Sequence, residues 1–406
     1  MSLLSFFSSK KESLVAVVDI GSSSVGVALI KSSFNKKSGW QSKIIYTTRT
    51  EARLETPYDF RRYIREITKA LHQSLNTALL SPPVRQAGKN GVPGKYICFL
   101  ASPFYIAQTR VVKYEEEAEF VLTPKLYQRI TTQEVARFLS HHAEIYPSLI
   151  DDTFFVIENK TMQIKLNGYE VTDPFNKKTT RAELVQYISG SSPSLARQFQ
   201  EEIIKITHHD RIEFHSFAFA AFSVLRDRLG EMASFLIIDV SGEITDVSVV
   251  TLGVLTEVTS FPLGRNSLVR QIAANLKTAY AEADSLLKLY ISGGTGGKAN
   301  SRLAKEVAKV KENWLAKMRE TLAGALESNI LPEQVYVIGD DRTAKIFMDW
   351  LTSGDFREFT MSNRPLQIKY LDSSFLNPHH NHEQNTRDVF VLVESLFYDK
   401  INHGSR

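Results

Sequence analysis

Two stretches of the chain show the same order of apolar and polar positions. Residues 14–30 (LVAVVDIGSSSVGVALI) contain two β-rich apolar runs separated by a Gly/Ser turn, which predicts a buried hairpin. Residues 235–253 (FLIIDVSGEITDVSVVTLG) repeat this order as apolar strand, polar turn and alternating strand. We therefore interpret the two stretches as an internal repeat.

Apolar residues spaced three and four positions apart predict helices around these hairpins. Such a stripe runs from Tyr58 to Leu79 and predicts a helix of about six turns. Residues 81–95 are rich in proline and glycine and predict an exposed loop. Thr131, with Glu134 three residues later, has the spacing of a capping box that opens a second helix. Further helices are expected from Ser267 to about Leu289, from Leu303 to about Leu326, and over residues 389–401.

The middle of the chain, about residues 110–206, differs from the segments on either side. Strand-like pieces flank Asn167-Gly168, a dipeptide that tolerates the positive φ angles of a tight hairpin turn. Another strand and another helix follow before residue 206. The pattern predicts a small α+β unit interposed between elements of a larger one.

Composition and charge narrow the class of protein. A chain of 406 residues with 43% hydrophobic content has room for roughly two or three domains. A net charge of +4 argues against a dedicated nucleic-acid binder. Cys98 is the single cysteine, so no internal disulfide can form and a cytoplasmic location is expected. No apolar run approaches the ~20 residues that span a bilayer, so any membrane contact must be peripheral.

Each hairpin carries an aspartate at the end of its first strand, Asp19 and Asp239, and small residues in its turn. An opened turn can present consecutive backbone N–H groups to an anion. Aspartates would then hold Mg²⁺ or its waters, which bridge to phosphates. The alternative is a pair of ordinary hairpins whose Asp and Ser side chains bond the local backbone, and for one hairpin alone it is the stronger interpretation.

Together with a glycine turn at Gly339, these segments resemble the actin-like superfamily, in which phosphate-1, connect-1, phosphate-2, connect-2 and adenosine segments follow one another. The corresponding residues are 17–26, 215–225, 237–248, 261–276 and 335–345. The interposed block, with its run VIENKTMQIKLNGYEVTDPF, is similar to that of the FtsA family of bacterial cell-division actins. The PilM family of type IV pilus assembly platforms is the neighbouring alternative.

The resemblance implies an α/β, actin-like (ribonuclease H-like) two-lobed fold with an inserted small α+β subdomain. The expected parts are a first lobe with the phosphate-1 hairpin (1–109), the inserted subdomain (110–206), a connect-1 helix returning to the first lobe (207–230), a second lobe (231–388) and a C-terminal helix packing on the first lobe (389–406).

The resemblance also implies a cleft for ATP and Mg²⁺. The candidate binding residues are Asp19, Gly21, Ser22, Ser23, Asp239, Ser241, Gly242, Thr245, Gly339 and Lys288, with Asp19 and Asp239 holding Mg²⁺ through water. For Lys288 the alternative is a helix-surface ion pair with Asp284. The chain departs from the family pattern where Ser24 replaces a common lysine, Ser241 replaces a glycine, and Asp340 follows Gly339.

Hydrolysis would need a group that orients the attacking water. The resemblance places Ser216 at this position, flanked by His215 and Glu213. Because of these departures, we expect a weak or degenerate nucleotide cleft and at most a weak ATPase.

The implied function is an FtsA-like scaffold that links a filament-forming, FtsZ-like partner to the inner face of the cell membrane, with self-association into filaments as a further expectation. A PilM-like pilus platform is one alternative. An active ATPase or small-molecule kinase of the same superfamily is another, and a member that binds no nucleotide is a third. Residues 1–11 combine apolar and basic side chains, which is typical of peripheral membrane contact, although a frayed terminus has the same composition.

Overall fold

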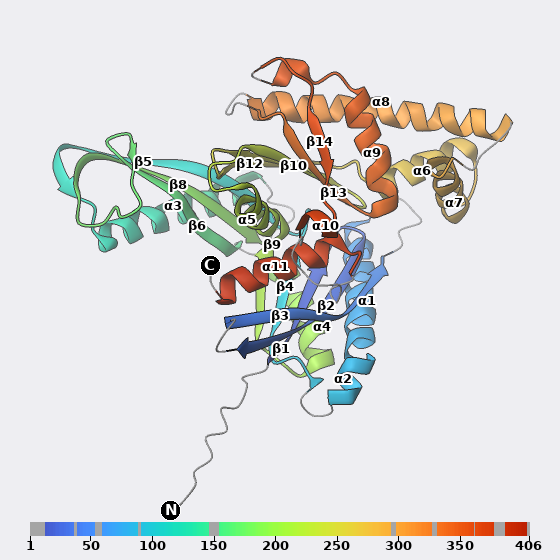
Figure 1. Cartoon of the computed structure of the whole chain (residues 1–406), viewed down its shortest axis with the longest axis horizontal. Helices are drawn as coiled ribbons and strands as arrows, with labels where there is room; N and C mark the ends of the chain where they lie inside the picture. Colours follow the sequence, from blue (N-terminus) through green and yellow to red (C-terminus); the bar gives the residue numbers. More distant parts are fainter. Residues whose placement is uncertain are drawn as a thin grey trace, which may run out of the picture.

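The computed structural model describes residues 13–35, 39–52, 59–87, 91–145, 154–293, 298–326, 331–360, 362–376 and 386–403. Two lobes lie one above the other in Figure 1, and a smaller sheet projects from their side. The predicted membrane-contact segment, residues 1–11, lies outside the described residues. Within the described ranges, no helix combines the length and hydropathy that crossing a membrane requires.

The sheet of the first lobe has the strand order β3-β2-β1-β4-β9. Its first three strands, β1 (Ser13–Ile20), β2 (Ser24–Asn35) and β3 (Gly39–Glu51), form an antiparallel meander. β4 (Tyr96–Leu100) and β9 (Ile212–Ser216) add two further strands, and both run parallel to β1. Helices α1 (Phe60–Leu79) and α4 (Pro193–Thr207) pack against each other in this lobe.

The second lobe repeats this topology. Its strand order is β12-β11-β10-β13-β14, with β10 (Phe235–Val240), β11 (Thr245–Thr251) and β12 (Val254–Phe261) as the meander and β13 (Gln334–Gly339) and β14 (Gln367–Tyr370) parallel to β10. The helices of this lobe are α6 (Arg265–Leu276), α7 (Tyr280–Ile291), α8 (Lys298–Leu326), α9 (Asp341–Ser353) and the 3₁₀ turn η2 (Arg357–Phe359). The predicted internal repeat and the arrangement in two lobes are therefore confirmed.

The projecting sheet has the order β5-β8-β6-β7 and lies beside helix α3 (Pro124–Ile145). Its strands are β5 (Ile106–Val121), β6 (Phe155–Leu166), β7 (Tyr169–Glu170) and β8 (Lys178–Ser191). Asn167 and Gly168, with φ angles of 50° and 85°, form the predicted tight turn between β6 and β7. The expected subdomain range of 110–206 stays a prediction. The packing of α4 on α1 favours an earlier boundary, near Ser191.

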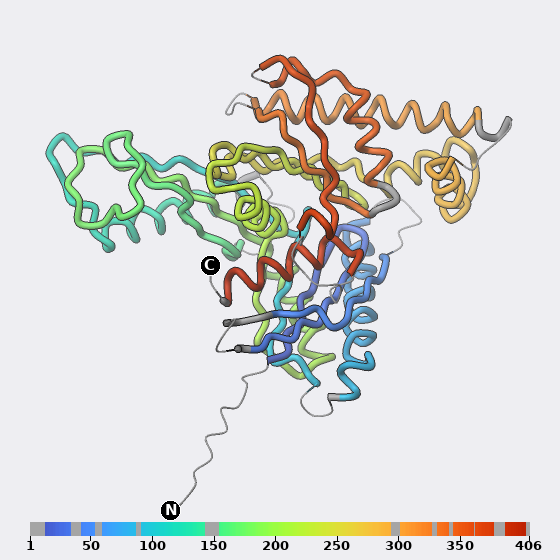
Figure 2. The backbone as a smooth tube through the Cα atoms, viewed as in Figure 1, coloured from blue at the N-terminus to red at the C-terminus, as the bar shows by residue number. Residues whose placement is uncertain are grey.

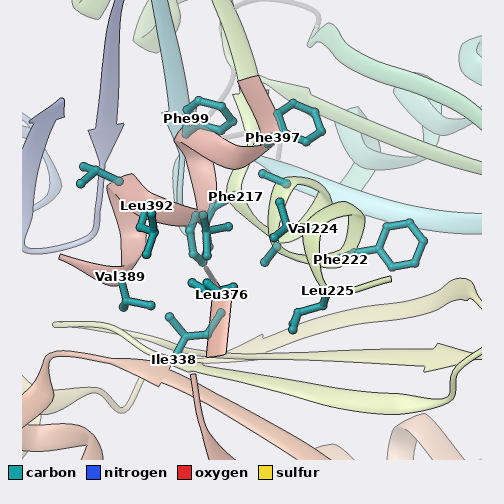
Figure 3. Close-up of a cluster of buried hydrophobic side chains, with 14 of the residues drawn as sticks. Phe99, Phe217, Phe222, Val224, Leu225, Ile338, Leu376, Val389, Leu392 and Phe397 are labelled. Atoms are coloured by element: carbon teal, nitrogen blue, oxygen red, sulfur yellow. The ribbon is translucent and has the colours of Figure 1, made fainter. Parts of the chain in front are cut away.

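Helices α5 (Phe217–Leu229) and α11 (Val389–His403) lie between the two sheets, together with the short α10 (Ser373–Leu376). Figure 3 shows their side chains meeting, with Phe99 of the first lobe and Ile338 of the second in the same buried cluster. The tube in Figure 2 shows the C-terminal helix returning to the strands of the first lobe, and α11 also contacts β13. A continuous apolar core therefore joins the lobes behind the hairpins.

Three predicted elements differ from the structure. The expected loop at 81–95 contains a helix, α2 (Pro82–Ala87), because proline is tolerated in a helix's first turn. The helix expected from Ser267 to Leu289 is two helices, since Lys277 adopts a left-handed φ of 57° and ends α6. The capping box at Thr131 was wrong: α3 begins at Pro124, and Thr123 Oγ1 accepts a hydrogen bond from the Leu126 amide.

Candidate functional site

The tips of the two repeated hairpins meet between the lobes. Ser22 Oγ lies 2.8 Å from Ser241 Oγ and accepts a hydrogen bond of 3.0 Å from the Glu243 backbone amide. Contact is so close that a Cβ added at Gly242 would lie 1.9 Å from Ser23 Oγ. Glycine is therefore required at this position, and protein atoms fill the space directly between the two turns.

A cavity of about 490 Å³ opens beside these tips. Its lining includes nine of the ten predicted binding residues, namely Asp19, Gly21, Ser22, Ser23, Asp239, Ser241, Gly242, Lys288 and Gly339. The volume lies within the range of small-molecule sites. The tenth residue, Thr245, is fully buried in the second lobe, where its hydroxyl donates to the Leu263 carbonyl and accepts from Trp314 Nε1. The structure thus does not bring Thr245 to this cavity.

Arg49, on β3, extends its guanidinium group into the cavity lining beside Asp19. Arg49 Nη2 lies 2.6 Å from Asp19 Oδ2, and Nε lies 2.7 Å from Asp388 Oδ2. Burial raises the pKa of the Asp19 carboxyl, and Arg49 opposes this shift. No motif in the sequence singles out Arg49, because it lies in an alternating strand 30 positions from Asp19.

The second aspartate, Asp239, has a different environment. It is 3% exposed, and neither carboxylate oxygen has a hydrogen-bond partner within the described part of the chain. Burial raises the pKa of Asp239 well above its usual value, and the nearby Asp246 and Asp19 raise it further. Burial also raises the pKa of Asp246 to about 7, against an opposing hydrogen bond from Ser102. These neighbouring carboxylates favour the uncharged form of Asp239 as long as no cation lies beside it.

The residues present do not fit a magnesium ion held between the two hairpins. Asp19 Oδ2 already binds the Arg49 guanidinium, which also binds Asp388 and so stays beside Asp19. The Glu243 amide, which a phosphate oxygen could otherwise accept from, is bound to Ser22. In the described ranges, no group of three or more His, Cys, Asp or Glu side chains has an arrangement suited to a metal ion.

Lys288 lines the cavity from α7, and its role in binding nucleotide stays a prediction. Its ammonium lies 2.6 Å from Asp284 Oδ2, so the predicted i,i+4 ion pair is present. Asp284 also pairs with Arg265, which lines the same cavity. The two cations therefore share one carboxylate, so these three groups together carry a net positive charge, while Asp340 adds a carboxylate to the same lining.

The segment expected to orient water for hydrolysis is bound elsewhere. Ser216 is fully buried, and its backbone N and Oγ donate to the Glu158 carboxylate at 2.9 Å each. His215 Nδ1 lies 3.3 Å from the same carboxylate, while Glu213 pairs with Lys95. None of Glu213, His215 and Ser216 belongs to the cavity lining. Glu158 anchors β6 of the projecting sheet to the first lobe, a role that sequence reasoning missed.

Comparison with protein-family models found no match for this chain, and comparison with curated proteins found none either. Among solved structures, a PilM-PilN type IV pilus biogenesis complex aligns with 97% of this chain and 99% of its own, at 12% identity and a TM-score of 0.58. A Bacteroides thetaiotaomicron protein of unknown function with an actin-like ATPase fold aligns over 96% and 99%, at 13% identity and a TM-score of 0.41. MreB 5 of Spiroplasma citri, bound to AMPPNP, aligns over 96% and 97%, at 10% identity and a TM-score of 0.41.

Likeness at such low sequence identity is informative about the fold alone. The repeated sheets, the hairpin tips that face each other and the PilM likeness agree that this is a two-lobed protein of actin-like fold. Its cavity lies where the two lobes meet.

Proposed function

We propose that this chain is an actin-like scaffold that holds an assembly partner, with a cleft that is degenerate as an ATPase site. The observation that carries this proposal is the direct contact of the two hairpin tips. The Ser22 hydroxyl is hydrogen-bonded to the Ser241 hydroxyl and accepts a hydrogen bond from the Glu243 backbone amide. We propose that this contact closes the gap through which a phosphate chain would otherwise pass between the two turns. The absence of Glu213, His215 and Ser216 from the cavity lining supports the same proposal.

We consider two alternative classes of partner for this scaffold. The likeness to a PilM-PilN complex over nearly the whole chain supports a pilus-assembly partner. The resemblance of the inserted block to the FtsA family supports a filament-forming, FtsZ-like partner, and attachment to the membrane through residues 1–11 belongs to this proposal as well. ATP in the cavity beside the tips is a proposal too, supported by the cavity volume and by the Arg265–Lys288 wall.

Phosphate release tests the scaffold role against the enzyme alternative. The purified full chain is incubated with ATP and Mg²⁺ beside an Asp239→Asn variant, which keeps the side-chain volume. We expect the two proteins to release phosphate at the same background rate. Turnover above background that is lost in Asp239→Asn would show an active ATPase, and phosphate transfer to a small molecule would show a kinase.

Capture of purified partners tests the assembly role. The immobilised full chain is presented with an FtsZ-like filament protein and, separately, with a PilN-type pilus protein. We expect one of the two to be retained to the same extent with and without ATP, because the tips are already in contact. Retention of neither protein, or retention only with ATP, would contradict the proposed function.

A further inference from the structure

Arg49 makes four polar contacts with its guanidinium group. Besides the 2.6 Å contact of Nη2 with Asp19, Nε and Nη2 lie 2.7 and 2.9 Å from the two carboxylate oxygens of Asp388. Nη1 donates to Ser24 Oγ at 2.9 Å. The fork geometry of a guanidinium matches such bidentate binding of a carboxylate. The group therefore joins the phosphate-1 hairpin to Asp388, which immediately precedes α11.

The surrounding residues are shaped to hold this side chain. A Cβ added at Gly26 would lie 2.6 Å from Arg49 Nη2 and 2.9 Å from its Cζ, so glycine leaves the room that the guanidinium occupies. The ring of Phe390 lies 5.2 Å from Cζ, within the range of a cation–π contact. Burial lowers the pKa of Arg49, but Asp388 and Asp19 outweigh it and the net shift is upward. Arg49 is thus a permanent positive charge, held in position by two carboxylates and by its close contacts with Gly26 and Phe390.

We infer that Arg49 is a resident cation that stands where a divalent metal would bind in front of Asp19, so that the cleft is held together without metal. This inference deepens the proposed function and rests on it, because Arg49 would keep the cleft of the scaffold in one arrangement without a metal ion. Mg²⁺ requires oxygen ligands at about 2.0–2.1 Å in near-octahedral geometry. An Asp19 oxygen in contact with Nη2 cannot supply such a ligand unless Arg49 leaves.

Thermal unfolding of the nucleotide-free full chain tests this inference. Midpoints are measured in EDTA and in increasing MgCl₂ for the wild type, for Arg49→Met, which removes the charge but keeps much of the length, and for Arg49→Lys. We expect the wild-type midpoint to be the same in EDTA and in millimolar Mg²⁺. Arg49→Met should unfold at a temperature lower by on the order of 5 °C or more, because it leaves buried carboxylates unpaired.

Mg²⁺ should then raise the midpoint of Arg49→Met, because Asp19 and Asp388 become available to a cation that binds only the folded state. Arg49→Lys should lie between, since lysine keeps the charge without the fork. Arg319→Met is the matched control: Arg319 also pairs with a carboxylate, Glu358, and lies over an aromatic ring, but on the second lobe. Its midpoint should not respond to Mg²⁺.

A wild-type midpoint that rises with Mg²⁺ as much as that of Arg49→Met would overturn the inference. An Arg49→Met protein that unfolds at the wild-type temperature and ignores Mg²⁺ would overturn it too. If Arg49→Met does not fold, the wild type and Arg49→Lys decide: a rise in the wild type refutes the inference, and a rise in Arg49→Lys alone supports it. These measurements use neither partner nor ATP, so their failure is distinguishable from failure of the proposed function.

Discussion

Replacement of Gly242 by alanine should force the two lobes apart at the hairpin tips. The new Cβ would lie 1.9 Å from Ser23 Oγ and 2.0 Å from Ser23 Cβ, whereas ordinary contact begins at 3.4 Å. The tips must therefore separate by about 1.5 Å. Inserting a methyl group into a packed site costs about 1–3 kcal/mol. Loss of the two hydrogen bonds of Ser22 adds about 1 kcal/mol each. We expect the free energy of unfolding to fall by roughly 3–5 kcal/mol.

Equilibrium urea unfolding measures this loss, and a double-mutant cycle assigns it to the contact between the tips. Ser23→Gly removes the two atoms that the new Cβ would overlap most and leaves Asn266 Nδ2, at 3.1 Å, as the next nearest, so Gly242→Ala with Ser23→Gly should recover most of the stability. The coupling energy should exceed about 1 kcal/mol, as is found for residues in direct contact. Hydrogen exchange of the Glu243 amide should accelerate in Gly242→Ala and slow again in the double variant, because Ser22 Oγ is its acceptor.

Gly94→Ala is the control, because a Cβ there meets no atom within 4 Å and its φ is not left-handed. Its stability should stay within about 0.5 kcal/mol of the wild type, as for most surface changes. The reasoning is refuted if Gly242→Ala unfolds at the wild-type urea concentration, or if its effect adds to that of Ser23→Gly without coupling.

Three further predictions concern residues away from the tips. Glu158→Gln should cost about 1–3 kcal/mol in urea unfolding and raise hydrogen exchange in residues 154–191, because the carboxylate accepts two bonds from Ser216; unchanged exchange there would contradict its anchoring role. Because the pKa of Asp246 is raised to about 7 in the folded chain, its contribution to stability is full below pH 4 and is lost as pH rises to 7, and Asp246→Asn should flatten the measured pH profile between those values. Gly324 lies at an exposed position of α8, where an added Cβ would meet no atom within 4 Å. Gly324→Ala should therefore increase the free energy of unfolding by up to about 1 kcal/mol and raise the unfolding midpoint, and a lower midpoint would contradict this prediction.

Sequence reasoning predicted those features that depend on neighbouring residues. Apolar runs around a turn predicted both hairpins, since the alternation of a strand and the chemistry of its turn are local. Asn167-Gly168 predicted its tight turn for the same reason. The single helix expected over residues 267–289 was wrong, because the left-handed conformation of Lys277, which ends α6, has no clear signal in its residue type.

Nine of the ten predicted binding residues line one cavity, yet the chemistry of that cavity differs from the expectation. Arg49 was missed because its partners, Asp19 and Asp388, lie 30 and 339 positions away in the chain. Strand alternation places Arg49 near the end of β3 but does not predict which residues its side chain contacts. The role of Gly26 follows only once that side chain is seen beside it.

The order and type of the residues therefore determined the repeated hairpins, because periodicity and turn chemistry act over a few positions, and the two-lobed fold was expected from the resemblance that these segments carry. Only the tertiary structure decided that the hairpins touch and that a guanidinium faces Asp19. Ser22 and Ser241 are 219 residues apart, and their 2.8 Å contact depends on the packing of α5 and α11 between the sheets. Such a distance results from the whole apolar core, and no local pattern encodes it.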